Sequence, residues 1–305
     1  MQTPLVSVLM TAYNRQDYIS EAIESVLTSG YEDFELIIVD DHSQDETVKV
    51  VQKYQSKDAR IRLYVNKRNL GDYPNRNHAA TYARGKYLKY LDSDDKLYSG
   101  GLEYCVNRME ANPGACWAIL YPVPIDTEYL MDTKQSIHHH FFTQPFLKAG
   151  PGGTIIRKDF FMKLGGYPVS YGPANDMYFN LQAASSGNTL LLKDIFLFYR
   201  RHTLQEQSNT YSYLYNNCRY LKDALEDLNL PLTPQQTAWL QKKRKRRFAL
   251  NITKYFLQTF NWKKTRYAAC QARFSLADLF AGIFHRSPKP EMWTLPLKCC
   301  ESIGN

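Results

Sequence analysis

The chain has 305 residues, of which 44% are hydrophobic and 22% are charged, and this balance excludes a fibrous or intrinsically disordered protein. The formal net charge of +8 is concentrated at one end of the chain. Residues 231–305 contain 14 Lys and Arg against 3 Asp and Glu and carry +11, whereas the first 230 residues carry −3. The basic character therefore belongs to an appendage.

The lack of targeting signals and the spacing of the cysteines predict a cytoplasmic protein. No run of 18 or more apolar residues is present, so we expect no transmembrane helix. The first residues lack the basic and apolar regions of a secretory signal. The six cysteines have no CxxC pair or metal-ligand spacing, and we expect reduced thiols rather than a disulfide framework.

Strands and helices are predicted to alternate over the first 95 residues. Apolar runs predict buried strands at residues 5–10, 34–39, 61–65 and 87–91. The intervening helices are expected at residues 19–29, 43–54 and 74–83. Ser43 and Glu46 have the spacing of a capping box, and Pro74 suits the first turn of a helix. This order is typical of an α/β fold with a mostly parallel sheet covered by helices on both faces.

The regular alternation fades after about residue 115. Residues 122–144 show no regular pattern, and residues 150–153 predict a tight loop. The remaining predicted elements are strands at 117–121, 189–192 and 195–199, a helix at 175–185, and helices from about residue 211. We therefore expect a catalytic domain over 1–210, with halves 1–115 and 116–210. A helical, basic C-terminal extension is expected over 211–305.

Polar clusters follow three of the predicted strands, at residues 11–14, 40–41 and 92–95. Ligands of parallel sheets bind beyond the carboxyl ends of the strands, so we expect one site at this rim. The three aspartates in residues 92–95 repel one another unless a cation lies among them. Their hard oxygen ligands suit Mg²⁺ or Mn²⁺, which can bridge a diphosphate. A polar turn with a helix cap is the alternative for an isolated Asp cluster.

Several segments of the chain together resemble glycosyltransferase family 2, whose members have the nucleotide-sugar-binding GT-A (Rossmann-like) fold. The similar segments are residues 4–15, 34–47, 69–77 and 85–95, and the resemblance extends to about His202. It implies an inverting, metal-dependent transfer from a nucleotide-diphosphate sugar to an acceptor hydroxyl. The acceptor would be a glycan or a lipid-linked saccharide.

The resemblance also implies roles for residues in the nucleotide half of the chain. Thr11 and Tyr13 would contact the nucleotide base, with the Tyr13 ring stacking on it, and Asp41 would hydrogen-bond to the base. Arg76 would lie near the base and the diphosphate. Taken singly, these residues also suit ordinary structural roles in turns, core packing and a solvated helix face.

Further implied roles concern the nucleotide sugar, the metal and the acceptor. Asp92 and Ser93 would bind the nucleotide sugar, and Asp94 would ligate the metal. His202 would complete the metal site, with Arg200 or Arg201 facing the diphosphate. A surface or packing role is the alternative for a single histidine. Residues 150–154 resemble the acceptor-side loop of the family, where small residues let a sugar approach the backbone.

Asp176 is the candidate general base. An inverting transfer needs a carboxylate to take the proton of the acceptor hydroxyl as it attacks the anomeric carbon. The family places an acidic residue at the start of a helix after a Gly-containing loop, and residues 172–176 match that position. Asn175 departs from the frequent Glu-Asp pair. The alternative is that Asp176 only stabilises the first turn of its helix.

Two charged or titratable runs remain. His138, His139 and His140 are expected in a solvated loop rather than a metal site, because consecutive side chains diverge. Residues 242–247 are six consecutive basic residues, and apolar side chains follow them through residue 284. This pattern suits an anionic membrane surface, and a solvated helix face or an oligomer contact explains it about equally well. No nucleic-acid partner is expected, since the rest of the chain is slightly acidic.

Two alternative functions fit the sequence less well than transfer of a sugar. A nucleotidyltransferase would need a glycine-rich basic loop after the first strand, and residues 11–15 lack one. A non-catalytic nucleotide-sugar-binding protein would not need both Asp94 and Asp176.

Overall fold

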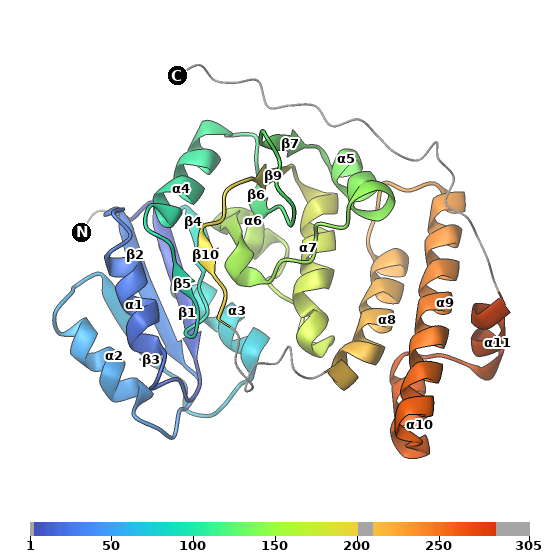
Figure 1. Ribbon diagram of the computed structural model, residues 1–305. Helices are drawn as coiled ribbons and strands as arrows, with labels where there is room; N and C mark the ends of the chain where they lie inside the picture. Colours follow the sequence, from blue (N-terminus) through green and yellow to red (C-terminus); the bar gives the residue numbers. More distant parts are fainter. Residues whose placement is uncertain (1–2, 201–209, 285–305) are drawn as a thin grey trace.

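The computed structural model describes residues 3–200 and 210–284 (Figure 1). Eight strands form one sheet in the order β3-β2-β1-β4-β8-β6-β9-β7. Its first half consists of four parallel strands, β1 (Val6–Ala12), β2 (Phe34–Asp40), β3 (Ile61–Val65) and β4 (Tyr87–Tyr90). All seven residues of β2 are buried, as expected for a central parallel strand covered on both faces.

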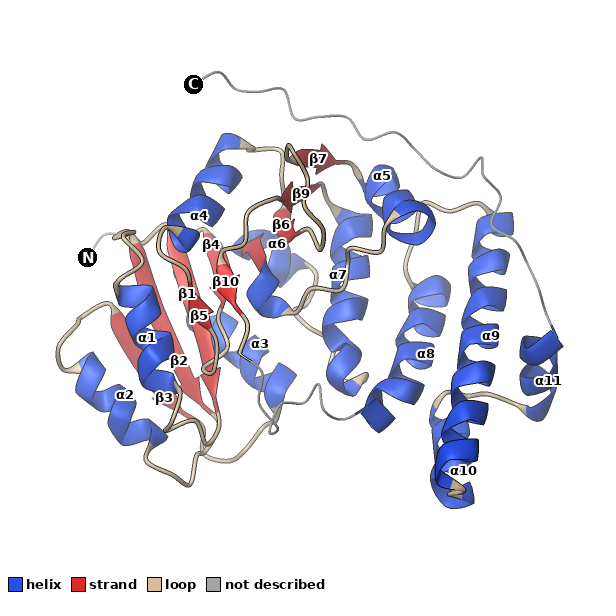
Figure 2. Cartoon of the chain, viewed as in Figure 1, coloured by secondary structure: helices blue, strands red, loops and turns tan. Residues whose placement is uncertain are grey.

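The helices cover both faces of the sheet, as predicted from the sequence (Figure 2). Side chains alternate along β1, so Val8 and Met10 pack with one set of helices and Leu9 with the other. The first set is α1 (Ile19–Leu27), α2 (Thr47–Gln55) and α4 (Gly101–Ala111). The second set is α3 (Asp72–Tyr82), α6 (Lys158–Lys163) and α7 (Asn175–Ser186).

The predicted capping box of Ser43 and Glu46 is wrong. Helix α2 begins at Thr47, and no side chain caps it at Glu46. The Ser43 hydroxyl instead donates to Asp40 Oδ2 at 2.5 Å, and the Ser43 amide donates to Oδ1 of the same carboxylate. Ser43 therefore braces the end of β2 rather than the start of the helix.

The second half of the sheet is mixed. Strand β8 (Thr154–Arg157) is antiparallel to both β4 and β6 (Trp117–Leu120), while β9 (Thr189–Leu192) is parallel to β6. Strand β7 (Tyr129–Met131) pairs antiparallel with β9 at the edge. A separate two-stranded sheet joins β5 (Lys96–Leu97) to β10 (Leu197–Phe198).

The histidine run lies in a buried helix, so the prediction of a solvated loop is wrong. Helix α5 (Thr133–His138) continues as a π-helical turn over His139–Thr143. All three histidines are buried, and the Tyr121 hydroxyl and His139 Nε2 are 2.7 Å apart. The Leu147 amide donates to His140 Nδ1 at 3.0 Å. Burial lowers the pKa of His140 to about 3, so this imidazole is a neutral core residue.

The expected C-terminal helices are present, as α8 (Thr210–Asp227), α9 (Pro234–Thr259), α10 (Trp262–Gln271) and α11 (Leu276–Phe284). Helix α8 packs against both α7 and α9 (Figure 1). The Tyr171 hydroxyl donates to Asp223 on α8 at 3.1 Å, which ties the loop before α7 to the C-terminal helices. The division of the chain at residue 210 remains a prediction.

Two further features of the chain bear on its sequence analysis. Within residues 3–200 and 210–284, no helix combines the length and apolarity needed to cross a membrane. The four cysteines in these ranges, at 105, 116, 218 and 270, are free thiols.

Candidate active site

The three polar clusters meet at one rim of the sheet. Strand β1 lies between β2 and β4, so the loops that follow these parallel strands emerge side by side. The Asp41 amide donates to the Ala12 carbonyl at 2.8 Å, which joins the first two loops. Arg15 Nε lies 3.3 Å from Asp94 Oδ2, which joins the first loop to the third.

The carboxylates of Asp92, Asp94 and Asp95 are crowded together. One oxygen from each lies within 4.8 Å of the others. Asp94 and Asp95 are buried and Asp92 is partly exposed. Burial, followed by the charge of Asp92, raises the pKa of Asp95 to about 7. Carboxylate oxygens in this arrangement fit a divalent cation such as Mg²⁺ or Mn²⁺, because the cation would remove their mutual repulsion.

Arg200 holds the segment after β10 against this cluster. Its amide donates to Asp95 Oδ1 at 2.9 Å, and its Nε donates to the Asp94 carbonyl at 3.0 Å. Its Nη2 donates to Glu21 on α1 at 2.8 Å. The predicted ligand His202, together with Arg201, lies outside the described residues.

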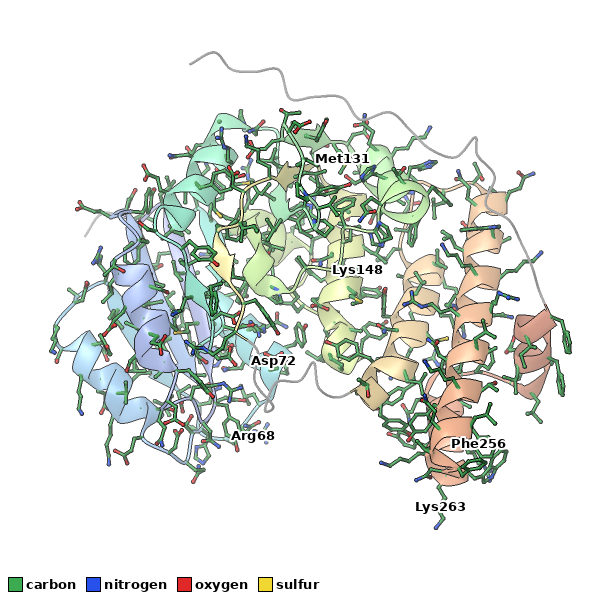
Figure 3. The ribbon with its side chains drawn as sticks, in the orientation of Figure 1. Arg68, Asp72, Met131, Lys148, Phe256 and Lys263 are labelled. Carbon is green, nitrogen blue, oxygen red and sulfur yellow. The ribbon has the colours of Figure 1, made fainter. Side chains whose placement is uncertain are left out.

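Arg76 is buried and bridges two elements. Its Nε lies 2.8 Å from Asp72 Oδ1, and its Nη1 lies 2.6 Å from Asp92 Oδ1. The second contact is an ion pair without straight hydrogen-bond geometry. The Tyr90 hydroxyl donates to the Arg76 carbonyl at 3.0 Å. Asp72, which Figure 3 labels at the start of α3, was not predicted from the sequence. Its spacing of four residues from Arg76 was the available signal.

The Asp41 carboxylate accepts hydrogen bonds from three groups of the protein itself. Its Oδ1 accepts from Asn66 Nδ2 and from the Leu70 amide, each at 2.8 Å, and its Oδ2 accepts from the Gly71 amide at 2.9 Å. These bonds shape the loop that leads into α3. Each carboxylate oxygen can accept more than one bond, so the predicted contact with a base stays a prediction.

The other residues predicted to bind the nucleotide sugar lie at the same rim. Thr11 is partly buried on β1, paired in register with Val39. Tyr13 follows β1 and has 44% of its surface exposed, so its ring is accessible for stacking. Ser93 is buried between Asp92 and Asp94. Their predicted contacts with a donor remain predictions.

Asp176 lies at the start of α7 and faces the predicted acceptor loop. Its Oδ2 is 3.8 Å from the point that a Cβ on Gly150 would occupy, which is an ordinary van der Waals distance, so the carboxylate lies directly beside this loop. Burial raises the pKa of Asp176 to about 7. The charge of Arg76 lowers this pKa and those of Asp72 and Asp92 raise it, so Asp176 lies within the electrostatic field of the same site.

Asn175 braces the turn that presents Asp176. Its Nδ2 donates to the Gly172 carbonyl at 2.7 Å, and its Oδ1 accepts from the Tyr171 amide at 2.8 Å. The structure thus gives a physical role to the residue that departs from the family pattern.

Lys89 is a further residue that the sequence analysis missed. It is fully buried on β4, and its Nζ donates to the Tyr90 carbonyl at 2.9 Å and to the Gly152 carbonyl. Burial lowers its pKa to about 8. The ammonium group therefore connects the strand that leads to the Asp cluster with the predicted acceptor loop.

Residues 7–164 match the family model described as glycosyl transferase family 2, which covers more than half of the chain. The chain belongs to glycosyltransferase family 2. This membership confirms the resemblance seen in the sequence.

Among family 2 relatives, the putative teichuronic acid biosynthesis glycosyltransferase TuaG of Bacillus subtilis is 43% identical over 100 residues, 33% of this chain and 40% of TuaG. The GalNAc(5)-diNAcBac-PP-undecaprenol beta-1,3-glucosyltransferase of Campylobacter jejuni is 37% identical over 112 residues, 36% of each chain. The chain spans less than half the length of these curated relatives.

Solved structures confirm the predicted fold class. The S. aureus TarS 1–349 structure in complex with UDP-GlcNAc has a TM-score of 0.68 at 18% identity, covering 88% of this chain and 80% of that one. The mannosyltransferase PcManGT from Pyrobaculum calidifontis, in complex with GDP-Man and Mn²⁺, has a TM-score of 0.59 at 14% identity. That match covers 92% of this chain and 86% of PcManGT. At these identities the likeness establishes the GT-A fold alone.

Proposed function

We propose that this chain is an inverting, metal-dependent glycosyltransferase that moves a sugar from a nucleotide-diphosphate sugar to an acceptor hydroxyl. The observation that carries the proposal is the cluster of Asp92, Asp94 and Asp95, of which Asp92 acts through its charge, together with Arg76, on the half-buried Asp176. The cluster suits a metal-held diphosphate, and Asp176 suits proton removal. Crystal structures of two proteins with this fold contain UDP-GlcNAc, or GDP-Man with Mn²⁺.

On the donor side, Asp94 would hold the cation, with Asp92 and Asp95 beside it. Bound Mn²⁺ or Mg²⁺ would neutralise the charge that develops on the departing diphosphate. Arg15 lies against Asp94, and Arg200 fixes Asp95 and the Asp94 backbone, so both keep the carboxylates in place. Tyr13 and Thr11 would contact the base at the exposed end of the same rim.

On the acceptor side, Asp176 would accept the proton of the attacking hydroxyl. A general base works best when its pKa lies near the operating pH, and burial gives Asp176 a pKa of about 7. Gly150 lies beside this carboxylate, so the acceptor would approach Asp176 along the predicted acceptor loop. Lys89 holds the Gly152 carbonyl and thereby fixes the loop across from the base.

The acceptor is proposed to be a glycan or a lipid-linked saccharide, since one relative is a glucosyltransferase whose name specifies an undecaprenol-linked substrate. A peripheral position at the inner face of the membrane is consistent with such an acceptor. The apolar surface suited to it lies where α9 meets α10, near Phe256 and Lys263 in Figure 3. Leu257, Phe260 and Trp262 are exposed there beside Lys263 and Lys264.

The basic run is a weaker candidate for the membrane surface than its sequence indicates. Arg244 is buried, Lys245 pairs with Asp278 at 2.6 Å, and Arg246 donates to the Ile283 carbonyl at 3.2 Å. Lys245 and Arg246 therefore stabilise the helical packing, and Arg244 is not accessible to a membrane. Sedimentation with anionic vesicles tests the alternative surface, and Trp262→Ser with Phe260→Ser should lose vesicle binding if it is correct.

The function is tested by thermal unfolding with UDP, GDP and their sugar conjugates, with and without Mn²⁺. At least one nucleotide should raise the melting temperature further when Mn²⁺ is present. The anomeric configuration of the product, read by NMR, then tests inversion. If no nucleotide stabilises the protein under any condition, the proposal fails.

A further inference from the structure

A cavity of about 430 Å³ lies between α8 and α9, and Met177 of α7 also lines it. The described residues that line it include four basic side chains and no Asp or Glu. The basic residues are Lys148, Arg244, Arg247 and Lys254. None of the four forms an ion pair with a described residue, so the cavity concentrates uncompensated positive charge.

The register of α9 directs part of the basic run into this cavity. Arg244, Arg247, Asn251, Lys254 and Gln258 recur at intervals of three or four residues and line the cavity together. Such spacing places side chains on one face of a helix. Lys242 and Lys243 belong to the same run but not to the lining. The run therefore divides between the cavity and other surfaces.

Two buried polar groups in the lining lack a hydrogen-bond partner among the described residues. Arg244 has only 7% of its surface exposed, and its Nη1 donates to Cys218 Sγ at 2.9 Å. Its Nε is buried without a partner, as is Asn217 Oδ1. Burying a guanidinium that contacts a thiol and no carboxylate costs folding free energy. An anion bound in the cavity would offset that cost.

The cavity adjoins the acceptor side of the active site. Met177, which follows the candidate base Asp176, lines it, and so does Lys148, two residues before Gly150. Figure 3 labels Lys148 beside α7. Tyr220 also lines the cavity, and the charges of both Asp176 and Arg247 act on its hydroxyl. Tyr220 is therefore close enough to both Asp176 and Arg247 to feel their charges. The lining contains none of residues 92–95.

We propose that this cavity binds a phosphate or diphosphate group of the acceptor, with Arg244, Arg247, Lys148 and Lys254 as its ligands. The inference rests on the proposed function, because the acceptor must reach Asp176 while its charged group is held here. Guanidinium groups bind phosphate oxygens in a bidentate manner, and tyrosine hydroxyls supply further donors. A membrane surface is a poorer partner, since a flat array of headgroups cannot reach a guanidinium buried between two helices.

The ligand chemistry has two sources: the diphosphate of a lipid-linked saccharide and a phosphate ester carried by a glycan. Binding of inorganic pyrophosphate, farnesyl diphosphate and glycerol 1-phosphate to the full chain is measured by calorimetry in EDTA, which keeps the Asp cluster free of metal. A preference for farnesyl diphosphate over pyrophosphate assigns the lipid-linked source. A preference for glycerol 1-phosphate assigns the phosphate ester of a glycan.

The variants are Arg247→Gln with Lys254→Gln, both exposed and therefore tolerant of change, and the matched control Lys242→Gln on the same helix. The double variant should bind the preferred probe at least about tenfold more weakly, since it loses two charge-assisted contacts. The control should bind like the wild type. Equal binding by wild type and double variant, or no binding of any probe at millimolar concentration, overturns the proposal.

Two further measurements distinguish this proposal from membrane binding and from the proposed transferase function. If the double variant loses binding to anionic vesicles but keeps probe binding, Arg247 and Lys254 face a membrane and the cavity assignment is wrong. The proposed function is read separately, from the stabilisation by UDP or GDP with Mn²⁺. Loss of that signal in the wild type, with metal-free probe binding intact, would refute the transferase and leave the phosphate site standing.

Discussion

Arg76 Nη1 lies 2.6 Å from Asp92 Oδ1, and this contact connects α3 to the Asp cluster. The same guanidinium binds Asp72, so one buried cation compensates two carboxylates. Burial lowers the pKa of Arg76, but the charges of Asp72 and Asp92 outweigh it and keep the group protonated. The arginine therefore offsets part of the negative charge of the cluster.

Replacement of Arg76 by Met should destabilise the protein in a pH-dependent way. Burial already raises the pKa of Asp72, and the charge of Arg76 limits that rise, so without the guanidinium the pKa of Asp72 rises further. The variant then loses stability as the pH rises from about 4, the unfolded pKa of Asp, through the raised folded pKa, so the loss is smaller at pH 5 than at pH 8. We expect a loss of about 1 to 3 kcal/mol at pH 8, below the cost of breaking a fully buried pair because Asp72 is half exposed.

Urea unfolding of Arg76→Met at pH 5 and pH 8 measures this difference. Arg60→Met, which breaks a surface pair with Asp58, is the control and should cost less than about 1 kcal/mol. An equal loss at both pH values would mean that Arg76 acts through packing alone.

Asp94→Asn should remove metal-dependent stabilisation while preserving the fold. The substitution keeps the side-chain shape but lowers the charge of the cluster, so the affinity for Mn²⁺ should fall at least about tenfold. A Mn²⁺ titration with UDP or GDP, followed by thermal unfolding, provides the measurement. Asp159→Asn is the control, because that carboxylate is exposed. A wild-type response in Asp94→Asn would remove Asp94 from the metal site.

Asp176→Asn should slow transfer by roughly 10²- to 10⁴-fold and leave donor affinity nearly unchanged. The wild-type rate should rise with pH, since only the deprotonated carboxylate accepts a proton. The apparent pKa should be about 7, or lower when a nearby cation favours the carboxylate. The variant should lose this dependence. Turnover within a few-fold of wild type would transfer the role of base to Asp159 or Asp194.

His140→Asn should change the response of stability to acid. The folded-state pKa of His140 is lowered to about 3 by burial, so the wild type loses stability as the pH falls below about 6.5. Between pH 7 and pH 5, the wild type should lose about 1 to 2 kcal/mol more than the variant. The Asn carbonyl oxygen can still accept from the Leu147 amide. Parallel loss in both proteins would show that His140 does not limit acid stability.

Much of the first half of the fold was predictable because its strands are uninterrupted apolar runs. Strand β3 has the predicted bounds, and β2 extends its prediction by one residue. Strand β7 and helix α5 were missed because elements of three and six residues show almost no periodicity. The histidines of α5 and of the π-helical turn after it are polar residue types, although burial keeps His140 neutral.

The candidate site was predictable where its residues follow strands, and not where they depend on distant partners. Asp92, Asp94 and Asp95 follow a buried strand directly, so their position at the rim could be inferred. Lys89 appears out of place in a buried strand until its acceptor is known, and that acceptor is the carbonyl of Gly152, far along the chain. Asp72 was missed because the predicted helix began two residues later, at Pro74.

The contact between Lys89 and Gly152 attaches the predicted acceptor loop to the sheet. The ammonium group projects from the strand that leads to the Asp cluster, so the loop cannot swing away without exposing a buried charge or breaking that strand end. The loop should therefore open only when the strand opens. Its amide protons, including that of Gly153, which donates to Gly150 at 2.9 Å, should exchange with solvent as slowly as those of β4. Under the proposed function, the distance between the diphosphate and the acceptor hydroxyl would then be set by the protein before either substrate binds.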